Sequence, residues 1–186
     1  MEEVELIIEA TNEQMSGAME HLQRELGKIT TGKASPALLE SIKVDYYGSS
    51  TLLSQIANLG TSDSRTITIQ PWERSMLAPI ERAIFEANLG FTPQNDGQLI
   101  RIFVPPLTQE RRIEFVKRAK SLGEDAKVSI RNARREAMEG IKKAVKDGYP
   151  EDVAKRNEQE IQDLTNNFTA KVDKALEVKE KEIMTV

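Results

Sequence analysis

A helical pattern that runs without interruption from Thr108 to about Lys146 constrains the fold of this chain more than any other feature. At a rise of 1.5 Å per residue such a helix would be about 60 Å long. Its apolar residues form only a narrow stripe, which includes Ala126, Ile130, Ala133 and Ala137. Because a stripe this narrow cannot stabilise a helix alone, the pattern predicts partners packed along its length.

Two further segments have the same kind of periodicity. Apolar residues of the N-terminal region recur in steps of three and four, at Val4, Ile8, Thr11, Met15, Ala18, Leu22, Leu26 and Ile29. A helix stop follows the long pattern, in which Gly148 ends one helix and Pro150 opens the next. The third seam is Ile161, Leu164, Phe168, Val172 and Ala175. Three long amphipathic helices with matching stripes predict a three-helix bundle.

The segment between the first helix and the other two predicts a small α/β domain. Alternating residues at 42–46, 65–70 and 99–104 are typical of strands, and residues 76–87 keep helical spacing. We therefore predict an α+β fold, with a long three-helix bundle formed by residues 1–30 and 106–186. Residues 31–105 form the inserted domain, a β/α/β sandwich.

The two segments that join the predicted domains, at about residues 30–36 and 104–107, are candidate hinges. They contain Gly32, Pro36, Pro105 and Pro106. Two short connections could let the domains change orientation without unfolding. The alternative is that Pro and Gly merely mark ordinary domain boundaries.

The long helix carries a basic stripe inside an acidic protein. Residues 110–135 contain nine Lys or Arg and four acids, so this segment is +5 although the whole chain is −4. Lys120, Lys127, Arg131 and Arg134 line up along the flank of the apolar face. A localised positive patch suggests a polyanionic partner bound at one place. The alternative is a charged face that only contacts solvent.

No catalytic set is recognisable, so we expect no enzyme, cofactor or metal. The absence of cysteine excludes disulfides, thiolate catalysis and Cys-ligated zinc, and His21 is the only histidine. Residues 27–34 nearly match a phosphate-binding loop, but Ala34 lacks the magnesium-binding hydroxyl and a helix, not a strand, precedes them. Neither a long apolar run nor a basic start is present, since the chain begins Met1-Glu2-Glu3, which predicts a cytoplasmic protein without membrane contact.

Three aromatic residues of the inserted segment leave two possibilities open. Tyr46, Tyr47 and Trp72 could stack on nucleic-acid bases. Aromatic residues in short strands more often fill a core.

Over its whole length the chain resembles the bacterial ribosome recycling factor family. The motifs that carry this resemblance are residues 28–36, Tyr46-Tyr47-Gly48, Asp63-Ser64-Arg65-Thr66, residues 105–112 and Arg131-Asn132-Ala133-Arg134-Arg135. Thr30 and Lys33 stand where many members have arginine, and Gln109 replaces a usual glutamate. None of these departures touches the cluster from Arg131 to Arg135.

The resemblance implies a non-enzymatic translation factor that, with elongation factor G and GTP, separates post-termination ribosomes into subunits. It implies an L-shaped molecule, expected as a monomer, whose bundle binds ribosomal RNA of the large subunit and whose small domain meets elongation factor G. The residues implied to bind RNA are Arg112, Lys127, Arg131, Arg134 and Arg135.

Two rival functions remain from the residues themselves. The first is a coiled-coil-like adaptor whose basic stripe pairs with acidic proteins, which RNA would not compete away. The second, more distant, is phosphoryl transfer at Gly32-Lys33, which requires nucleotide binding.

Overall fold

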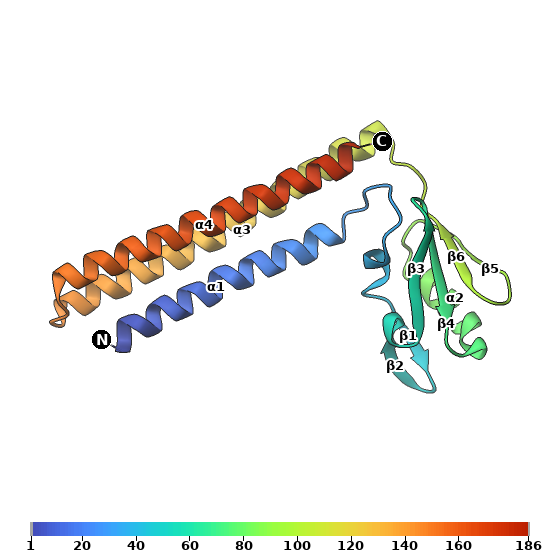
Figure 1. The fold of residues 1–186 in the computed structure, drawn as a ribbon, viewed down its shortest axis with the longest axis horizontal. Coiled ribbons are helices and arrows are strands. Elements are labelled where there is room, and N and C mark those ends of the chain that lie inside the picture. Colours follow the sequence, from blue (N-terminus) through green and yellow to red (C-terminus); the bar gives the residue numbers. More distant parts are fainter. Residues whose placement is uncertain (1, 186) are drawn as a thin grey trace. The chain divides into compact units, whose positions relative to one another are not determined.

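The computed structural model describes residues 2–185, which form two compact units. One unit is helical and comprises residues 2–29 and 113–185. The other, residues 30–112, contains all the described strands (Figure 1). The predicted outer limits of the bundle, residues 1 and 186, lie outside the described residues.

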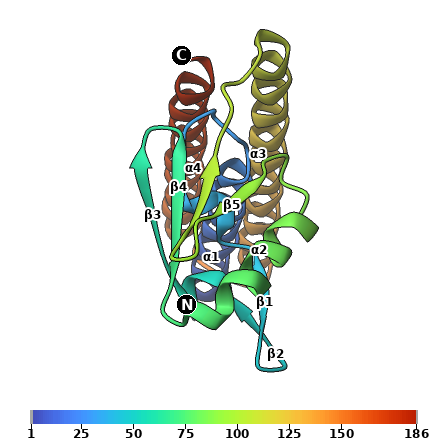
Figure 2. The same cartoon turned by 90° about the vertical axis from the view of Figure 1, so that its right-hand side faces the viewer.

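Three long helices build the first unit. They are α1 (Glu2–Gly27), α3 (Gln109–Lys146) and α4 (Glu151–Met184). Figures 1 and 2 show the three helices running alongside one another, with α3 opposite in direction to α1 and α4. The predicted bundle is therefore confirmed. No helix among residues 2–185 is both long enough and apolar enough to cross a membrane.

Local hydrogen bonds explain where α3 begins and ends. At its start the Thr108 hydroxyl accepts a hydrogen bond from the backbone N–H of Arg111, at 3.2 Å, as an N-cap does. At its end Gly148 adopts a φ of 103°, and the N–H of Tyr149 donates to the carbonyl of Ala144 at 2.9 Å. This arrangement is a Schellman motif, which favours glycine at its left-handed position. The predicted helix stop is thus confirmed.

The face of α3 that is buried in the bundle is made mainly of small residues. Its buried side chains include Ala119, Ala126, Ile130, Ala133, Ala137, Ile141 and Ala144. A methyl group on Gly123 would overlap the Leu176 side chain of α4, and one on Gly140 would lie 2.9 Å from Ile7 of α1. Small residues of α3 therefore let the larger side chains of its neighbours approach closely.

The predicted seams of α1 and α4 are largely the buried ones. In α1, Met19 is buried although the predicted seam omits it, whereas Ile8 and Ala18 are only half-buried. In α4, Thr165 is buried where the prediction had its neighbour Leu164, which is half-buried. A buried Thr is tolerated because its hydroxyl donates to the carbonyl one turn earlier, Ile161, at 2.8 Å.

The small domain contains six strands in two antiparallel sheets. The strands are β1 (Lys43–Tyr46), β2 (Ser49–Leu52), β3 (Ala57–Asp63), β4 (Thr66–Pro71), β5 (Pro93–Asn95) and β6 (Ile100–Phe103). β1 pairs with β2, and the other four pair in the order β3-β4-β6-β5. The sequence predicted β1, β4 and β6 but not β2, β3 or β5.

One helix, α2 (Leu77–Glu86), packs with these strands around a common core. The core is rich in isoleucine: Ile67 and Ile69 of β4, Ile100 and Ile102 of β6, and Ile80 and Ile84 of α2 are all buried. Alternate residues of β4 and β6 face this core, as expected for strands with one buried face.

Candidate nucleic-acid interface

Arg131 and Arg135 of α3 are the most accessible members of the predicted RNA-binding set. Both side chains are exposed, and neither has a hydrogen bond or ion pair with any other residue between 2 and 185. Their spacing of four residues places them on one side of the helix, about 6 Å apart along its axis. The two guanidinium groups are therefore free to bind an anion outside the bundle.

Two exposed lysines of α3 extend this surface toward the start of the helix. Lys117 and Lys120 lie within about 60° of Arg131 and Arg135 around the helix axis, counting 100° per residue. One acid, Glu124, lies on the same arc. We call Lys117, Lys120, Arg131 and Arg135 the exposed basic face, and it is positive overall.

Lys127 and Arg134 instead contact α4. The Nε of Arg134 donates a hydrogen bond to Oε1 of Gln162 at 2.8 Å, and Nζ of Lys127 forms an ion pair with Oδ1 of Asp173 at 2.6 Å. These contacts hold both side chains against the bundle. Arg134 still has N–H donors beyond Nε, because a guanidinium carries five.

Arg112 does not belong to this surface. It is only 8% exposed and interacts with other parts of the protein, at the start of α3 in the unit that contains the strands. Burial of an arginine requires partners for its charge, and little of the Arg112 side chain is accessible to a ligand outside the protein.

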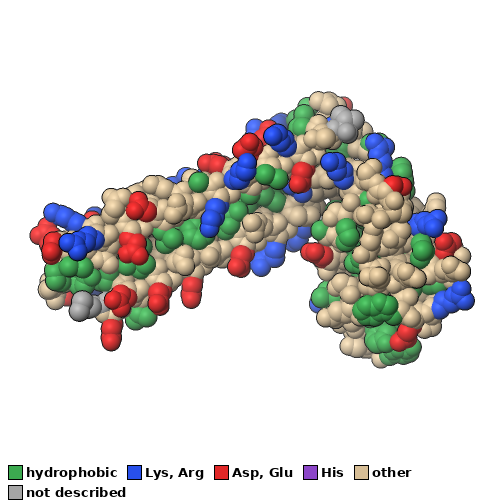
Figure 3. Space-filling model, viewed as in Figure 1, with side chains coloured by type: hydrophobic (Ala, Val, Ile, Leu, Met, Phe, Trp, Pro, Cys, Tyr) green, Lys and Arg blue, Asp and Glu red, His purple; other side chains and the backbone are tan. Residues whose placement is uncertain are grey.

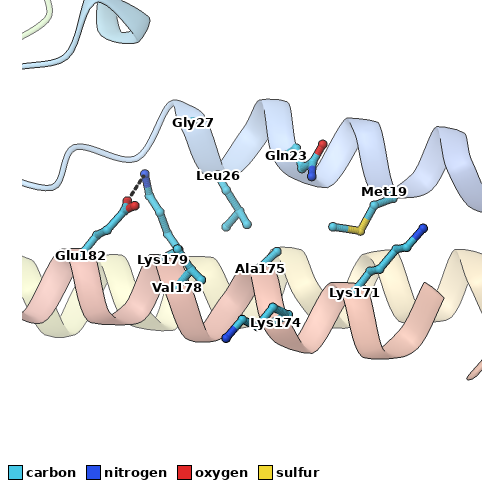
Figure 4. Close-up of a pocket in the computed structure, with 10 residues that line it drawn as sticks. All are labelled: Met19, Gln23, Leu26, Gly27, Lys171, Lys174, Ala175, Val178, Lys179 and Glu182. Atoms are coloured by element: carbon cyan, nitrogen blue, oxygen red, sulfur yellow. Dashed lines mark ion pairs between the residues drawn. The ribbon is translucent and has the colours of Figure 1, made fainter. Parts of the chain in front are cut away.

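A groove between α1 and α4 carries a second group of basic side chains (Figure 4). It has a volume of about 460 Å³, and Met19 and Leu26 reach into it from α1. Lys171, Lys174 and Lys179 line it from α4. Burial lowers the pKa of Lys179, an effect that the carboxylate of Glu182, 3.8 Å away, opposes. This group was not predicted, although the three-residue spacing of Lys171 and Lys174 in the sequence is a signal for part of it.

Two segments connect the long helices to the small domain, one after α1 and one before α3. Both are hydrogen-bonded to the same turn of the small domain, the one between β3 and β4. The N–H of Ala34 donates to the carbonyl of Ser64 at 2.8 Å, and the N–H of Val104 donates to the carbonyl of Arg65 at 2.7 Å. The first and second connections therefore leave the small domain next to each other. Residues 30–33 and 105–107 lie between these two anchored residues and the helices.

Asp63 organises this turn between β3 and β4. Its carboxylate accepts hydrogen bonds from the N–H of Arg65 at 2.8 Å and from the hydroxyl of Thr66 at 3.1 Å. These bonds, the one from Arg65 foremost, lower the pKa of Asp63. The motif Asp63-Ser64-Arg65-Thr66 thus has a structural purpose that the sequence alone did not reveal.

The four predicted hinge residues have different environments. Gly32 has a φ of 79°, which favours glycine, and a methyl group there would lie 3.4 Å from the backbone N of Leu107. Pro36 opens a 3-10 turn at Pro36–Leu39. Pro105 and Pro106 are exposed and lie in the irregular segment between β6 and α3. The segments that hold Gly32 and Leu107 are therefore in contact.

No metal site accompanies these features: residues 2–185 contain no group of three or more acidic or histidine side chains that could hold a metal ion.

Comparison with known proteins gives a consistent result. A family model described as "Ribosome recycling factor" matches residues 22–184. The ribosome-recycling factor of Flavobacterium johnsoniae is 52% identical over 185 residues, which cover 100% of this chain and 99% of that protein. The ribosome-recycling factor of Porphyromonas gingivalis is also 52% identical, with both chains covered completely.

Solved structures agree with these relatives. A structure described as "Solution structure of the ribosome recycling factor" has a TM-score of 0.85 and 39% identity, and both chains are covered completely. A second has a TM-score of 0.70 and 41% identity, and it covers 98% of this chain and 99% of the other. It is described as "Models for the T. thermophilus ribosome recycling factor and the E. coli elongation factor G bound to the E. coli post-termination complex". The model match and the full-length identities show that this chain belongs to the ribosome recycling factor family.

Proposed function

We propose that this protein, with elongation factor G and GTP, separates post-termination ribosomes into their subunits and frees them from messenger RNA. Family membership supports this role, and it makes the chain a translation factor rather than an enzyme. The similar structure with elongation factor G on a post-termination complex supports the same partners. The site of action is the cytoplasm, where translation takes place in bacteria, and the chain acts as a monomer.

The observation that carries the RNA-binding part of this proposal is the accessibility of Arg131 and Arg135. An arginine without an internal partner can donate two parallel N–H groups to one phosphate, which gives a charge-assisted and bidentate contact. Such contacts position a protein on RNA without reading its sequence. Large-subunit ribosomal RNA is the proposed ligand of the exposed basic face.

The remaining members of the predicted set have supporting roles. Arg134, held by Gln162, presents its remaining N–H groups beside Arg131. Lys127 contributes charge that Asp173 partly neutralises. Arg112 is left out of the contact surface because it is buried.

The two connections, predicted as hinges at residues 30–36 and 104–107, are proposed to move at residues 30–33 and 105–107, so Pro36 belongs to the small domain. Because Ala34 and Val104 are hydrogen-bonded to the small domain, the movable residues are those between these anchors and the helices, notably Gly32, Pro105 and Pro106. In this mechanism the partner GTPase supplies the energy, and the bundle acts as a rigid lever between the subunits.

Light scattering of post-termination ribosomes tests the proposed function. We expect scattering to fall when this protein, elongation factor G and GTP are all present, because smaller subunits scatter less than whole ribosomes. No fall with the cognate elongation factor, despite measurable ribosome binding, would contradict the proposal and favour an adaptor.

A pair of arginine variants tests the interface. Arg131→Ala should weaken binding to large subunits by about 1.5–3 kcal/mol, the range for a lost hydrogen bond to a charged group. Arg156→Ala on α4 is the matched control, since Arg156 is also exposed and lies on another helix. Filter binding or sedimentation at several salt concentrations measures the affinity of each variant for large subunits. An equal loss of affinity in the two variants would argue against a localised interface.

A further inference from the structure

The small domain contains a pocket of about 410 Å³ that none of the contacts above uses. Two aromatic rings, Tyr46 and Trp72, and the carboxylate of Glu73 line it, and Ile56 and Met76 add apolar surface. All five residues belong to the unit formed by residues 30–112. The pocket therefore combines aromatic faces with one acidic group.

Two tyrosines hold the carboxylate in a fixed position. The hydroxyl of Tyr46 donates to Oε1 of Glu73, and the hydroxyl of Tyr47 donates to Oε2, both at 2.7 Å. The two tyrosine rings meet edge to face, with centroids 4.7 Å apart. The hydrogen bonds from Tyr47 and Tyr46 lower the pKa of Glu73, so its side chain is charged at neutral pH. Each oxygen retains a lone pair for another donor.

Large aromatic surfaces beside the carboxylate face solvent. Trp72 is 68% exposed and Tyr47 is 76% exposed. The backbone N–H of Trp72, the residue after β4, donates to the carbonyl of Ile56 at 3.2 Å, which fixes the backbone at this position. Figure 3 shows hydrophobic side chains gathered at the end of the small domain that carries the β1–β2 hairpin. Exposed aromatic residues on a rigid element are typical of protein-binding surfaces.

No basic side chain neutralises the pocket. None of its lining residues, all within the described part of the chain, is Lys or Arg. The next residue along the chain, Arg74, donates its Nε to the carbonyl of Gly97 at 3.1 Å instead. A preformed carboxylate without a counter-charge, flanked by aromatic faces, has the chemistry that attracts a cation.

We propose that this pocket binds an arginine side chain from a basic segment of a partner protein. A guanidinium is planar, so it can stack on the Trp72 ring while two of its N–H groups point at Glu73. A nucleobase could also stack on Trp72, but the phosphates attached to it would be repelled by Glu73. The observations therefore favour a protein partner over RNA at this place.

This inference goes beyond the proposed function and does not depend on it. The pocket lies in the small domain, whereas the exposed basic face lies on the bundle. Arg131→Ala should leave pocket binding unchanged, and loss of pocket binding should leave large-subunit binding by the bundle unchanged. The two proposals can therefore fail separately.

Trp72 provides the test, because it is the only tryptophan in the chain. The full-length protein is titrated with the end-capped tripeptide Gly-Arg-Gly while tryptophan fluorescence is recorded. We expect a saturable change. A matched peptide with citrulline, which has the same shape but no charge, should bind at least tenfold more weakly. Equal binding of the two peptides would overturn the proposal.

Variants locate the effect at the carboxylate. Glu73→Gln should weaken binding of the arginine peptide at least tenfold, and Glu86→Gln, the same change at an exposed position of α2 outside this pocket, should have no effect. Tyr47→Phe keeps the ring but removes one hydrogen bond to Glu73, so a smaller loss is expected. Unchanged binding in Glu73→Gln would also overturn the proposal.

Two controls complete the experiment. Circular dichroism checks that each variant is folded, and if Glu73→Gln is not, the comparison of arginine and citrulline peptides on the unmodified protein decides. Guanosine monophosphate is titrated in parallel. Saturable binding of the nucleotide without binding of the arginine peptide would assign the pocket to a base and reject the protein partner.

Discussion

The bundle and the small domain bury different side chains and expose different ones. The inner face of α3 consists mainly of alanine and glycine, whereas the small domain is filled by isoleucines from β4, β6 and α2. On the outside, α3 presents Arg131 and Arg135, and the small domain presents Tyr47 and Trp72. The difference teaches that one chain exposes two chemically different surfaces, a charged one on the bundle and an aromatic one on the small domain.

The largest effect is expected from the small-domain core. Ile69→Ala removes a side chain that is 0% exposed and should cost about 2–5 kcal/mol of unfolding free energy. Because the two units have separate cores, calorimetry should show a lower midpoint for one transition only. Ile130→Ala, in the bundle, is the reciprocal variant. A single transition that both variants shift equally would contradict the separation of the two cores.

Smaller changes in unfolding free energy are expected from two glycines in the helices of the bundle, and the two changes should have opposite signs. Gly123→Ala should destabilise the bundle by about 1–3 kcal/mol, because the new methyl group overlaps Leu176. Gly17→Ala should stabilise it by about 0.5–1 kcal/mol, because nothing lies within 4 Å and alanine favours helix. Urea denaturation followed by circular dichroism measures both. Stabilisation by both changes would show that α3 and α4 are not closely packed at Gly123.

The smallest effect is expected at the turn that anchors the two connections. Asp63 has a lowered pKa in the folded state, so its contribution to stability is present above the ordinary pKa of 3.8 and is lost as pH falls through the lowered value. Asp63→Asn should therefore reduce stability slightly at neutral pH and make the acid-induced loss less steep. The thermal midpoint of the small domain is measured from pH 2 to pH 7 for the unmodified protein and for Asp63→Asn. The same dependence of the midpoint on pH in both proteins would contradict the prediction.

The helices were predictable because their patterns repeat over many turns. Residues 108–146 predicted α3 to within one residue at its start, and the stop around Gly148 follows from a left-handed position that favours glycine. β3 was not predicted, because its exposed and half-buried residues include Asn58, Gly60 and Thr61, which give no apolar alternation. β3 forms a strand because it is hydrogen-bonded to β4, and not because its own sequence favours a strand.

The cluster of basic side chains on α3 was predictable from the sequence, but the contacts of its members were not. Helical spacing brought Lys127, Arg131 and Arg134 to one flank. It could not show that Gln162 and Asp173 of α4 hold two of them, because those partners are distant in sequence. Nor could it show that Arg112 is buried, since burial depends on tertiary packing that helical spacing does not describe.

The hydrogen bonds from Ala34 and Val104 to neighbouring residues of one turn have a consequence for how the chain is connected. The chain enters and leaves the folded insert at neighbouring positions. For the helices on either side, the folded insert is therefore equivalent to a short linker. The entropy of closing that gap depends on the few residues outside the anchors and not on the length of the insert. The segment between the anchors is therefore a unit suited to transplantation into another helical scaffold.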